Sequence, residues 1–338
     1  MPDPNTLVVV NCAGRTRSIL GAESLRRAGV PNRVLALRNG TMGWELAGLK
    51  VARGRTERYP AGRPETAGLA LERAKRFAEA SGVGVIGPLD LDRFEEDPDR
   101  TIYVLDVRDP AEFAVRHRPG TRNAPGGQLI QATDAWIGVR NARIALIDDD
   151  GVRARMSGAW LRQMGHRDVF VVEGALDDLA EPGPAVPLTP EVDETDEIPE
   201  DALVLDLARS IEFRAGHIPG AIWGVRTRLT PLRDRLSTAS HVVITSPDGI
   251  LARLAAPEVK GMTDAPVQVL RGGTKAWAAS GGKLEADKTN PPDEACIDFY
   301  LRPYDRNSGV EAAMQAYLSW EIDLVREIER DGTVAFGV

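Results

Sequence analysis

Residues 8–25 place one cysteine between an apolar run and a helix-like pattern. The stretch reads VVVNCAGRTRSILGAESL, with Cys12 directly after the apolar run and Arg15 and Arg17 in the short loop that follows. A loop between a strand and a helix can aim successive backbone N–H groups at one point, where the helix N-terminus adds partial positive charge. Gly14 permits the backbone angles of a tight ring. These features favour thiolate over thiol and predict a nucleophile for anionic substrates.

Composition excludes several other classes of function. The 338 residues carry a formal net charge of −8, so no positive field favours nucleic acid or an anionic membrane surface. No run of 18 apolar residues is present, and no membrane span is expected. The first ten residues, MPDPNTLVVV, lack the features of a signal peptide, which favours a cytoplasmic location.

The remaining reactive side chains suggest no second centre. Cys296 has no basic neighbours and is expected to be structural. Two cysteines give no disulfide framework and fit a reducing compartment. The four histidines show no ligand spacing, so neither a metal nor a cofactor is expected.

Two sequence patterns recur along the chain. LRNGTMGW at 37–44 returns as LRGGTKAW at 270–277, and YVLDVRDPAEFAVRHRPGT at 103–121 resembles LVLDLARSIEFRAGHIPGA at 203–221. Between these anchors the order is constant: an apolar strand, a loop, a helix, a second strand and a Gly-rich turn. Strands that alternate with helices of about ten residues predict α/β modules, each a small parallel sheet flanked by helices on both faces.

The three copies differ in completeness. The middle copy predicts strands at 102–107, 144–147 and 169–172 and helices at 111–115 and 154–165. The last copy predicts strands at 203–207, 242–245 and 267–270 and helices at 211–214 and 252–260. The first copy lacks its first half, and it contains only a strand at 7–10, the cysteine loop, a helix at 18–28, a strand at 33–37 and the Gly-Trp turn. We expect this half to lean on its neighbours, to borrow a strand from another chain, or to have lost residues upstream.

These copies suggest four domains and two linkers. We expect a truncated module with the cysteine loop at 1–60, further modules at 66–180 and 190–283, and a helical extension at 284–338. Residues 53–64 are a polar linker, and 68–80 predict a helix that leads into the middle module. The stretch 181–200, EPGPAVPLTPEVDETDEIPE, is expected to be an exposed connector.

The helical extension carries an apolar pattern near its end. Apolar side chains at rough i, i+4, i+7 spacing predict one amphipathic helix. They are Val310, Met314, Tyr317, Ile322, Val325 and Ile328. We expect this helix to pack on the last repeat, and a dimer contact or an inter-domain contact is the alternative.

The loop spacing resembles that of the rhodanese family of sulfurtransferases. Four residues separate Cys12 from Arg17, as in the family's active loop. Cysteine phosphatases use five intervening residues and commonly place a histidine where this chain has Asn11, which disfavours a phosphatase or an arsenate reductase. Further motifs resemble the family's early and late turns. They are Asp106–Arg108 with Glu112–Phe113, Glu212–Phe213 with Gly216–Ala221, Gly40–Trp44, and Gly273–Trp277.

The resemblance implies tandem rhodanese-like modules and a two-step sulfur transfer. By the family's mechanism, Cys12 attacks the outer sulfur of thiosulfate, and the loop amides and Arg17 stabilise the resulting persulfide. Cyanide or a thiol then accepts the sulfur. The implied catalytic residues are Cys12 and Arg17, and the implied substrate-binding residues are Ala13, Gly14, Arg15, Thr16 and Arg17.

The two arginines favour a small dianionic donor, and 3-mercaptopyruvate is the alternative donor. The implied partners are this donor and a thiol or cyanide acceptor, without nucleic acid or membrane, and a homodimer remains open.

The other two loops have lost the cysteine. An alignment without gaps, counted back from Gly29 and Gly165, places Asp148 at the position of Cys12 and Arg153 at the position of Arg17. The last loop has Ser246 at the cysteine position and Leu251 at the arginine position. An aspartate cannot carry a sulfane sulfur, and the serine has no base in its loop to activate it. We therefore expect both modules to be catalytically inactive. This leaves a second hypothesis for the whole chain, a silent scaffold or regulatory binding protein in sulfur metabolism.

Overall fold

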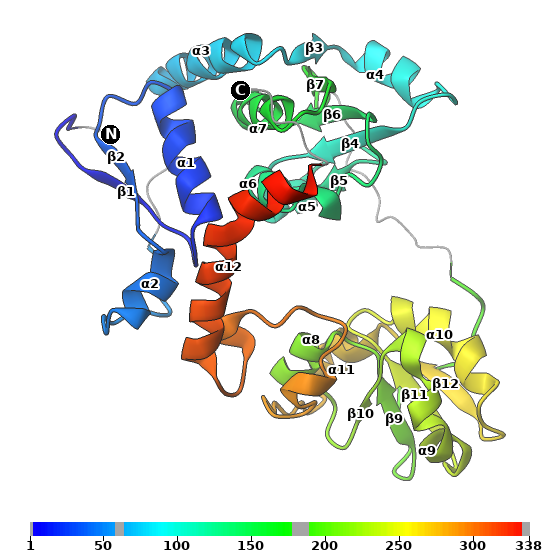
Figure 1. Ribbon diagram of the computed structural model, residues 1–338. Coiled ribbons are helices and arrows are strands. Elements are labelled where there is room, and N and C mark those ends of the chain that lie inside the picture. The colour runs from blue at the N-terminus through cyan, green and yellow to red at the C-terminus, as the bar shows by residue number, and fades with distance from the viewer. Residues whose placement is uncertain (1–2, 58–63, 178–188, 333–338) are drawn as a thin grey trace. The chain divides into compact units, whose positions relative to one another are not determined.

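The computed structural model describes residues 3–57, 64–177 and 189–332, which fall into two compact units (Figure 1). The first unit comprises residues 1–184 and 314–338, and the second comprises residues 185–313. Each unit contains a five-stranded parallel sheet flanked by helices, and the first also contains a two-stranded sheet. This arrangement confirms the predicted α/β fold class.

The large sheet of the first unit has the order β3-β7-β6-β4-β5. Its strands are β3 (Gly84–Ile86), β4 (Ile102–Asp106), β5 (Arg122–Asn123), β6 (Arg143–Ile147) and β7 (Asp168–Val172). Alternate side chains of a strand point to opposite faces, so an apolar run fills two cores. On β6, Ile144 and Leu146 belong to one buried cluster, whereas Ala145 and Ile147 belong to another.

Five helices accompany this sheet. They are α3 (Pro64–Ala80), α4 (Pro88–Glu95), α5 (Pro110–Val115), α6 (Gly126–Gln131) and α7 (Val152–Gln163). Leu129 of α6 and Leu161 of α7 are buried in the cluster that contains Ile144, and Leu91 of α4 is buried in the opposite cluster. The helices therefore cover both faces, as a parallel sheet requires.

The second unit repeats this plan with the strand order β10-β9-β11-β12-β8. Its strands are β8 (Glu194–Thr195), β9 (Leu203–Asp206), β10 (Ile222–Trp223), β11 (Val242–Thr245) and β12 (Val267–Leu270). Its helices are α8 (Ser210–Ala215), α9 (Arg233–Ser237), α10 (Ile250–Lys260) and α11 (Gly273–Ala279). On β11, Ile244 and Val243 face the two separate cores.

The N-terminal half-module contains two strands and two helices. They are β1 (Val8–Val10), α1 (Thr16–Arg27), β2 (Val34–Ala36) and α2 (Gly40–Leu46), and β1 and β2 pair in parallel. Helix α1 contacts α6, and Leu20 packs against the core of the middle module. Trp160 Nε1 of α7 donates to Ser24 Oγ of α1 at 2.8 Å. Within this chain, the half-module thus gains its core contacts from the middle module.

The prediction that residues 181–200 form an exposed connector is wrong near the end of this stretch. Glu194–Thr195 form the edge strand β8, which pairs with Val269 and Leu270 of β12. Arg253 and Arg271 both form ion pairs with Glu194. Glu194 thus pairs with one arginine of helix α10 and with another that directly follows β12. The stretch 178–188 lies outside the described residues.

The predicted C-terminal helix is present as α12 (Val310–Asp331), but its predicted packing on the last repeat is wrong. From Met314 onward, the chain belongs to the first unit. The buried face consists of Met314, Leu318 and Glu321, whereas Ile322 and Val325 are exposed. The apolar pattern misled because the packed face combines Met314 and Leu318 with a buried glutamate, whereas Ile322 and Val325 lie outside that face.

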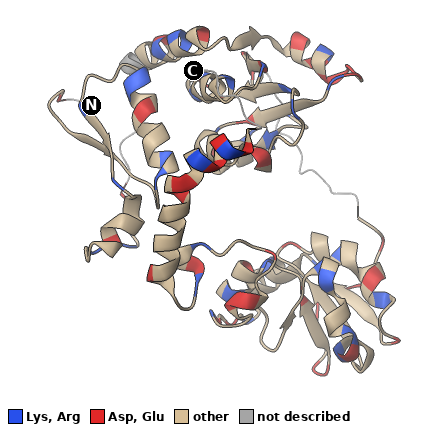
Figure 2. Cartoon of the chain, viewed as in Figure 1, with Lys and Arg blue, Asp and Glu red and all other residues tan. Residues whose placement is uncertain are grey.

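Charged side chains are spread over the helices. Helices α3, α4 and α12 each carry both acidic and basic side chains (Figure 2). Among the described residues, no helix combines the length and apolar character needed to cross a bilayer. Within the same ranges, no cluster of three or more His, Cys, Asp or Glu side chains is arranged to hold a metal ion.

Candidate active site

Cys12 lies half-buried in the loop between β1 and α1. Helix α1 begins at Thr16, four residues after the cysteine. Helices α7 and α10 likewise begin four residues after Asp148 and Ser246, and each of these residues follows its strand directly. The three side chains therefore stand at one structural position, so the two complete modules show what fills that position when the cysteine is absent.

The first turn of α2 holds the cysteine loop from outside. Thr41 N donates to Cys12 O at 2.9 Å, and Met42 N donates to Ala13 O at 3.0 Å. Gly40 adopts a φ of 59°, and a Cβ at this residue would lie 2.3 Å from Cys12 O. Only glycine meets both demands. With these carbonyls held by α2, the loop is fixed at two consecutive peptide groups.

The last module holds its loop in the same way. Thr274 N donates to Ser246 O at 3.0 Å, and Lys275 N donates to Pro247 O at 3.0 Å. A Cβ at Gly273 would lie 2.0 Å from Ser246 O. The Gly-Thr pair that recurs in the two sequence patterns therefore holds the loop in place, and we call it the latch. Its glycine allows the two backbones to approach closely, and the amides of the two residues after the glycine bind the loop carbonyls.

Ser18 is the side chain hydrogen-bonded to the sulfur. Its Oγ lies 3.3 Å from Cys12 Sγ and also donates to Arg15 O at 3.0 Å. Ser18 is fully buried. Ser18 was not predicted as a site residue, although it lies only six positions after the cysteine.

In the other two loops, the residue six positions after the equivalent of Cys12 also forms a hydrogen bond with the side chain at that position. Ala154 N donates to Asp148 Oδ2 at 3.0 Å, and Ala252 N donates to Ser246 Oγ at 3.3 Å. In all three loops, the side chain at the cysteine position thus bonds to the residue six positions later.

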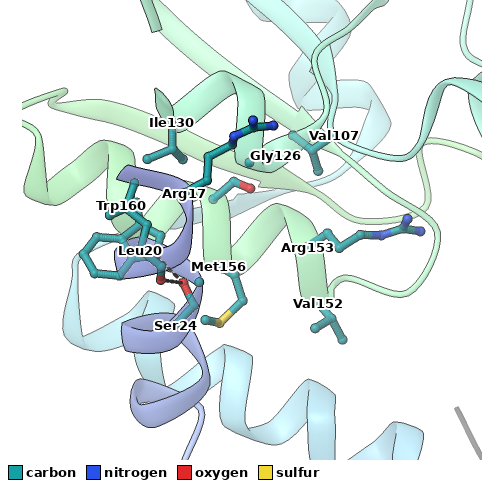
Figure 3. Close-up of a pocket in the computed structure, with 13 residues that line it drawn as sticks. Arg17, Leu20, Ser24, Val107, Gly126, Ile130, Val152, Arg153, Met156 and Trp160 are labelled. Atoms are coloured by element: carbon teal, nitrogen blue, oxygen red, sulfur yellow. Dashed lines mark hydrogen bonds between the residues drawn. The ribbon is translucent and has the colours of Figure 1, made fainter. Parts of the chain in front are cut away.

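The two arginines of the loop point to different places. Arg15 Nη1 donates to Asn39 Oδ1 at 3.2 Å, next to the start of α2. Arg17 is exposed and lines a pocket of about 270 Å³ between α1 and the helices α6 and α7. Figure 3 shows Arg17 near Gly126 and Ile130. Among the described residues, none forms an ion pair or a side-chain hydrogen bond with the guanidinium of Arg17, so its positive charge is unpaired.

The pocket beside Arg17 is mainly apolar. It includes the side chains of Leu20, Val107, Ile130, Val152, Met156 and Trp160. Arg153 also lines it, but its guanidinium pairs with Glu112 at 2.6 Å and with Asp149 at 2.8 Å. Arg17 is thus the loop cation that faces this pocket.

Glu321 of α12 occupies the outer end of the cysteine loop. Its Oε2 accepts from Arg15 N at 3.0 Å, and its Oε1 accepts from Thr16 N at 3.3 Å and from Thr16 Oγ1 at 2.7 Å. The side chain is 9% exposed. A Cβ at Gly14 would lie 2.7 Å from Oε2. Glu321 was not predicted as a site residue, because no local pattern links it to a loop 306 residues away.

The middle loop holds a carboxylate of its own. Asp148 accepts from Gly151 N at 2.9 Å as well as from Ala154 N, and it is buried. Burial, with a smaller contribution from the neighbouring Asp150, raises the pKa of Asp148 to about 6, although the two amide bonds oppose the shift. A fixed acidic group therefore fills the space that a cysteine side chain takes in the first loop.

The last loop is closed by apolar packing. Ser246 is fully buried, and Leu251, at the position of Arg17, packs against the core of the second unit. Across the described ranges, no histidine or carboxylate bonds to the hydroxyl of Ser246. The loop thus keeps its shape without a group that activates the serine.

Comparisons with known proteins agree with this repeated architecture. A family model described as Rhodanese-like domain matches residues 89–181 and 191–280, together more than half of the chain. The chain belongs to the rhodanese-like family. The two matched ranges are the rhodanese-like modules that contain Asp148 and Ser246, and the Cys12 loop lies outside them.

One solved structure resembles this rhodanese-like chain along its full length. It is the crystal structure of a thiosulfate sulfurtransferase from Pseudomonas aeruginosa, with 42% sequence identity and a TM-score of 0.87. The match covers 100% of this chain and 66% of that one, so the present chain spans somewhat less than two thirds of its relative.

Shorter matches concern about a quarter of the chain. The Alr3790 protein from Anabaena sp. and the BH2092 protein from Bacillus halodurans are both 22% identical, with TM-scores of 0.24. Each match covers 26% of this chain, against 70% of the first protein and 65% of the second. No curated protein matches the sequence.

Proposed function

We propose that the protein is a sulfurtransferase that moves sulfane sulfur through a persulfide on Cys12. The thiolate attacks the outer sulfur of thiosulfate, and sulfite leaves with the electron pair of the broken S–S bond. Cyanide or a thiolate then attacks the outer sulfur of the persulfide, and Cys12 regains its thiolate. The observation that carries this proposal is the placement of Cys12 at a strand-to-helix turn, with Ser18 bonded to its sulfur.

The loop supplies two kinds of group for an anionic donor. The backbone amides of Ala13, Gly14, Arg15 and Thr16 belong to a turn at the N-terminus of α1, where partial positive charge favours anions. Arg17 adds an unpaired positive charge beside the adjacent pocket. In this proposal, Arg17 attracts the donor and the amides hold the transferred sulfur. Thiosulfate fits this charge better than 3-mercaptopyruvate, which carries one negative charge.

The two complete modules serve as scaffold in this proposal. Asp148 cannot form a persulfide, and Ser246 has no bonded base. The middle module supports α1 through Trp160 and the core around Leu20. The second candidate function, regulatory binding without turnover, is favoured by one observation: Glu321 already occupies two loop amides.

A thiosulfate-to-cyanide assay tests the proposal. The wild-type protein and C296S are expected to form thiocyanate, whereas C12S is expected to lose at least about a hundredfold in rate. Mass spectrometry after thiosulfate treatment is expected to find one additional sulfur atom on the peptide with Cys12. Equal rates for C12S and wild type, or a persulfide on Cys296 instead, would overturn the proposal.

A further inference from the structure

The carboxylate of Glu321 occupies hydrogen-bond donors of the cysteine loop that the proposed reaction assigns to an anionic sulfur donor. It takes the backbone N–H groups of Arg15 and Thr16 and the hydroxyl of Thr16. These are the first amides of α1, whose own N-cap residue provides no capping side chain. Glu321 therefore caps α1 from a distant helix, with a negative charge that the helix N-terminus favours.

No cation shares this carboxylate. Among the described residues, Glu321 forms no ion pair with lysine, arginine or histidine, and the nearby Arg15 guanidinium bonds to Asn39 instead. Tyr317 OH adds a weak bond at 3.4 Å. A buried carboxylate is stable only when its hydrogen bonds are made. Apart from the weak bond of Tyr317, those bonds come from the cysteine loop.

An incoming donor anion competes for the same groups. Two N–H groups cannot give full hydrogen bonds to two anions at once, and two like charges at one loop repel each other. Gly14 shows how closely the carboxylate approaches, because a methyl group at this residue would lie 2.7 Å from Oε2 and 2.9 Å from the ring of Tyr317. A neutral molecule that reacts at sulfur needs neither amide.

We infer that Glu321 is a specificity-determining residue of the Cys12 site, an internal ligand that an anionic reactant displaces. Its carboxylate weakens the binding of anions at the loop and leaves neutral reactants little affected. The link to sulfur transfer depends on the proposed function, whereas the discrimination by charge does not.

Alkylation of Cys12 by two reagents of different charge tests this inference. Iodoacetamide is neutral and iodoacetate is anionic, and in both cases the thiolate displaces iodide. The measured quantity is the ratio of the iodoacetate rate to the iodoacetamide rate at Cys12, in C296S background at one pH. E321Q is expected to raise this ratio about tenfold. E329Q, with the same charge change at an exposed position of the same helix, is expected to leave it unchanged.

A purely structural role of Glu321 predicts a different result. Loss of a helix cap alone alters both rates alike and leaves their ratio at the wild-type value. E321D is the second variant, because it keeps the charge but draws the carboxylate back from both amides, and it is expected to raise the ratio in the same direction. A folded E321Q or E321D with the wild-type ratio overturns the inference.

Sulfur transfer gives the linked measurement. E321Q is expected to lower KM for thiosulfate about tenfold, with little change in kcat. If the wild-type protein forms no thiocyanate but the alkylation ratio still rises in E321Q, the proposed function fails and the role of Glu321 stands. If thiocyanate forms and the ratio does not change, the role of Glu321 fails and the function stands.

Discussion

The hydroxyl of Ser18 bridges the sulfur of Cys12 and the carbonyl of Arg15, at 3.3 Å and 3.0 Å. A hydroxyl has one proton, so while Ser18 donates to Arg15 O, the thiol of Cys12 is the donor between the pair. Once Cys12 is ionised, the hydroxyl proton can turn to the sulfur. Because Ser18 is fully buried, a mutation leaves no ready path for water to replace it.

The variant S18A is therefore expected to slow the reactions of Cys12. A hydrogen bond to a charged group contributes roughly 1.5–3 kcal/mol, which predicts about a tenfold to hundredfold lower rate of iodoacetamide alkylation at fixed pH. Thiocyanate formation is expected to fall in parallel. T6A removes an exposed hydroxyl of the same half-module, outside the cysteine loop, and serves as the control. Equal alkylation of S18A and wild type would exclude this role.

The close contact of the latch glycine, Gly40, leads to a second prediction, for which Gly48 provides a matched control. Gly40 and Gly48 both have positive φ, but only at Gly40 does an added Cβ meet the loop, 2.3 Å from Cys12 O. G48A is expected to cost about 1 kcal/mol and to preserve activity. G40A is expected to cost more and to abolish thiocyanate formation. Urea unfolding and the assay measure both effects, and identical behaviour of the two variants would contradict the latch.

The position of Arg17 predicts an effect on substrate capture more than on turnover. R17Q removes an unpaired charge and is expected to raise KM for thiosulfate about threefold to tenfold, with kcat less affected. R33Q removes an exposed charge of the same half-module outside the loop and is expected to change neither constant. The KM of the wild type is also expected to rise with salt more steeply than that of R17Q. A large fall in kcat for R17Q would assign this arginine to the chemical step instead.

Asp148 predicts how stability depends on pH. Burial raises its pKa to about 6 in the folded protein, above its ordinary value of 3.8. The folded state therefore binds a proton more tightly than the unfolded state. This contribution is fully present below pH about 4 and is lost as pH rises through about 6, a change of up to about 3 kcal/mol.

Replacement by the residue of the last loop tests this dependence. D148S is expected to flatten the fall in stability between pH 4 and pH 7, because serine does not titrate there. Hydrogen exchange of the β6 amides, corrected for its intrinsic pH dependence, measures the effect locally. D134N, a change at an exposed aspartate, is expected to retain the wild-type slope. The same slope in D148S would show that another group is responsible.

The apolar runs made most of the large sheets predictable. The predicted strand at 144–147 is β6, and the predicted strand at 242–245 is β11, because runs buried on both faces leave an unbroken apolar signal. The edge strands β3 and β8 were not predicted. Gly84–Ile86 and Glu194–Thr195 are too short for a recognisable period, and their pairing depends on neighbouring strands rather than on their own residues.

The site was predictable only where it is local. Cys12, its loop and the equivalence with Asp148 follow from spacing along the chain, since each lies four residues before a helix. The direction of Arg17 depends on the packing of α1 against the middle module. Glu321 was beyond prediction because a glutamate on an apolar helix ordinarily faces solvent, and its partners are more than 300 residues away.

The Gly-Thr latch around Ser246 survives in a module that holds no thiol. The conformation of this loop is thus maintained by backbone hydrogen bonds and does not depend on a reactive side chain. The substitution S246C would place a thiol in a loop whose backbone is already held by α11. The side chain at this position bonds to the amide of Ala252. Because the side chain at position 246 is fully buried, a thiol placed there would be shielded from reagents until the apolar packing around it opened.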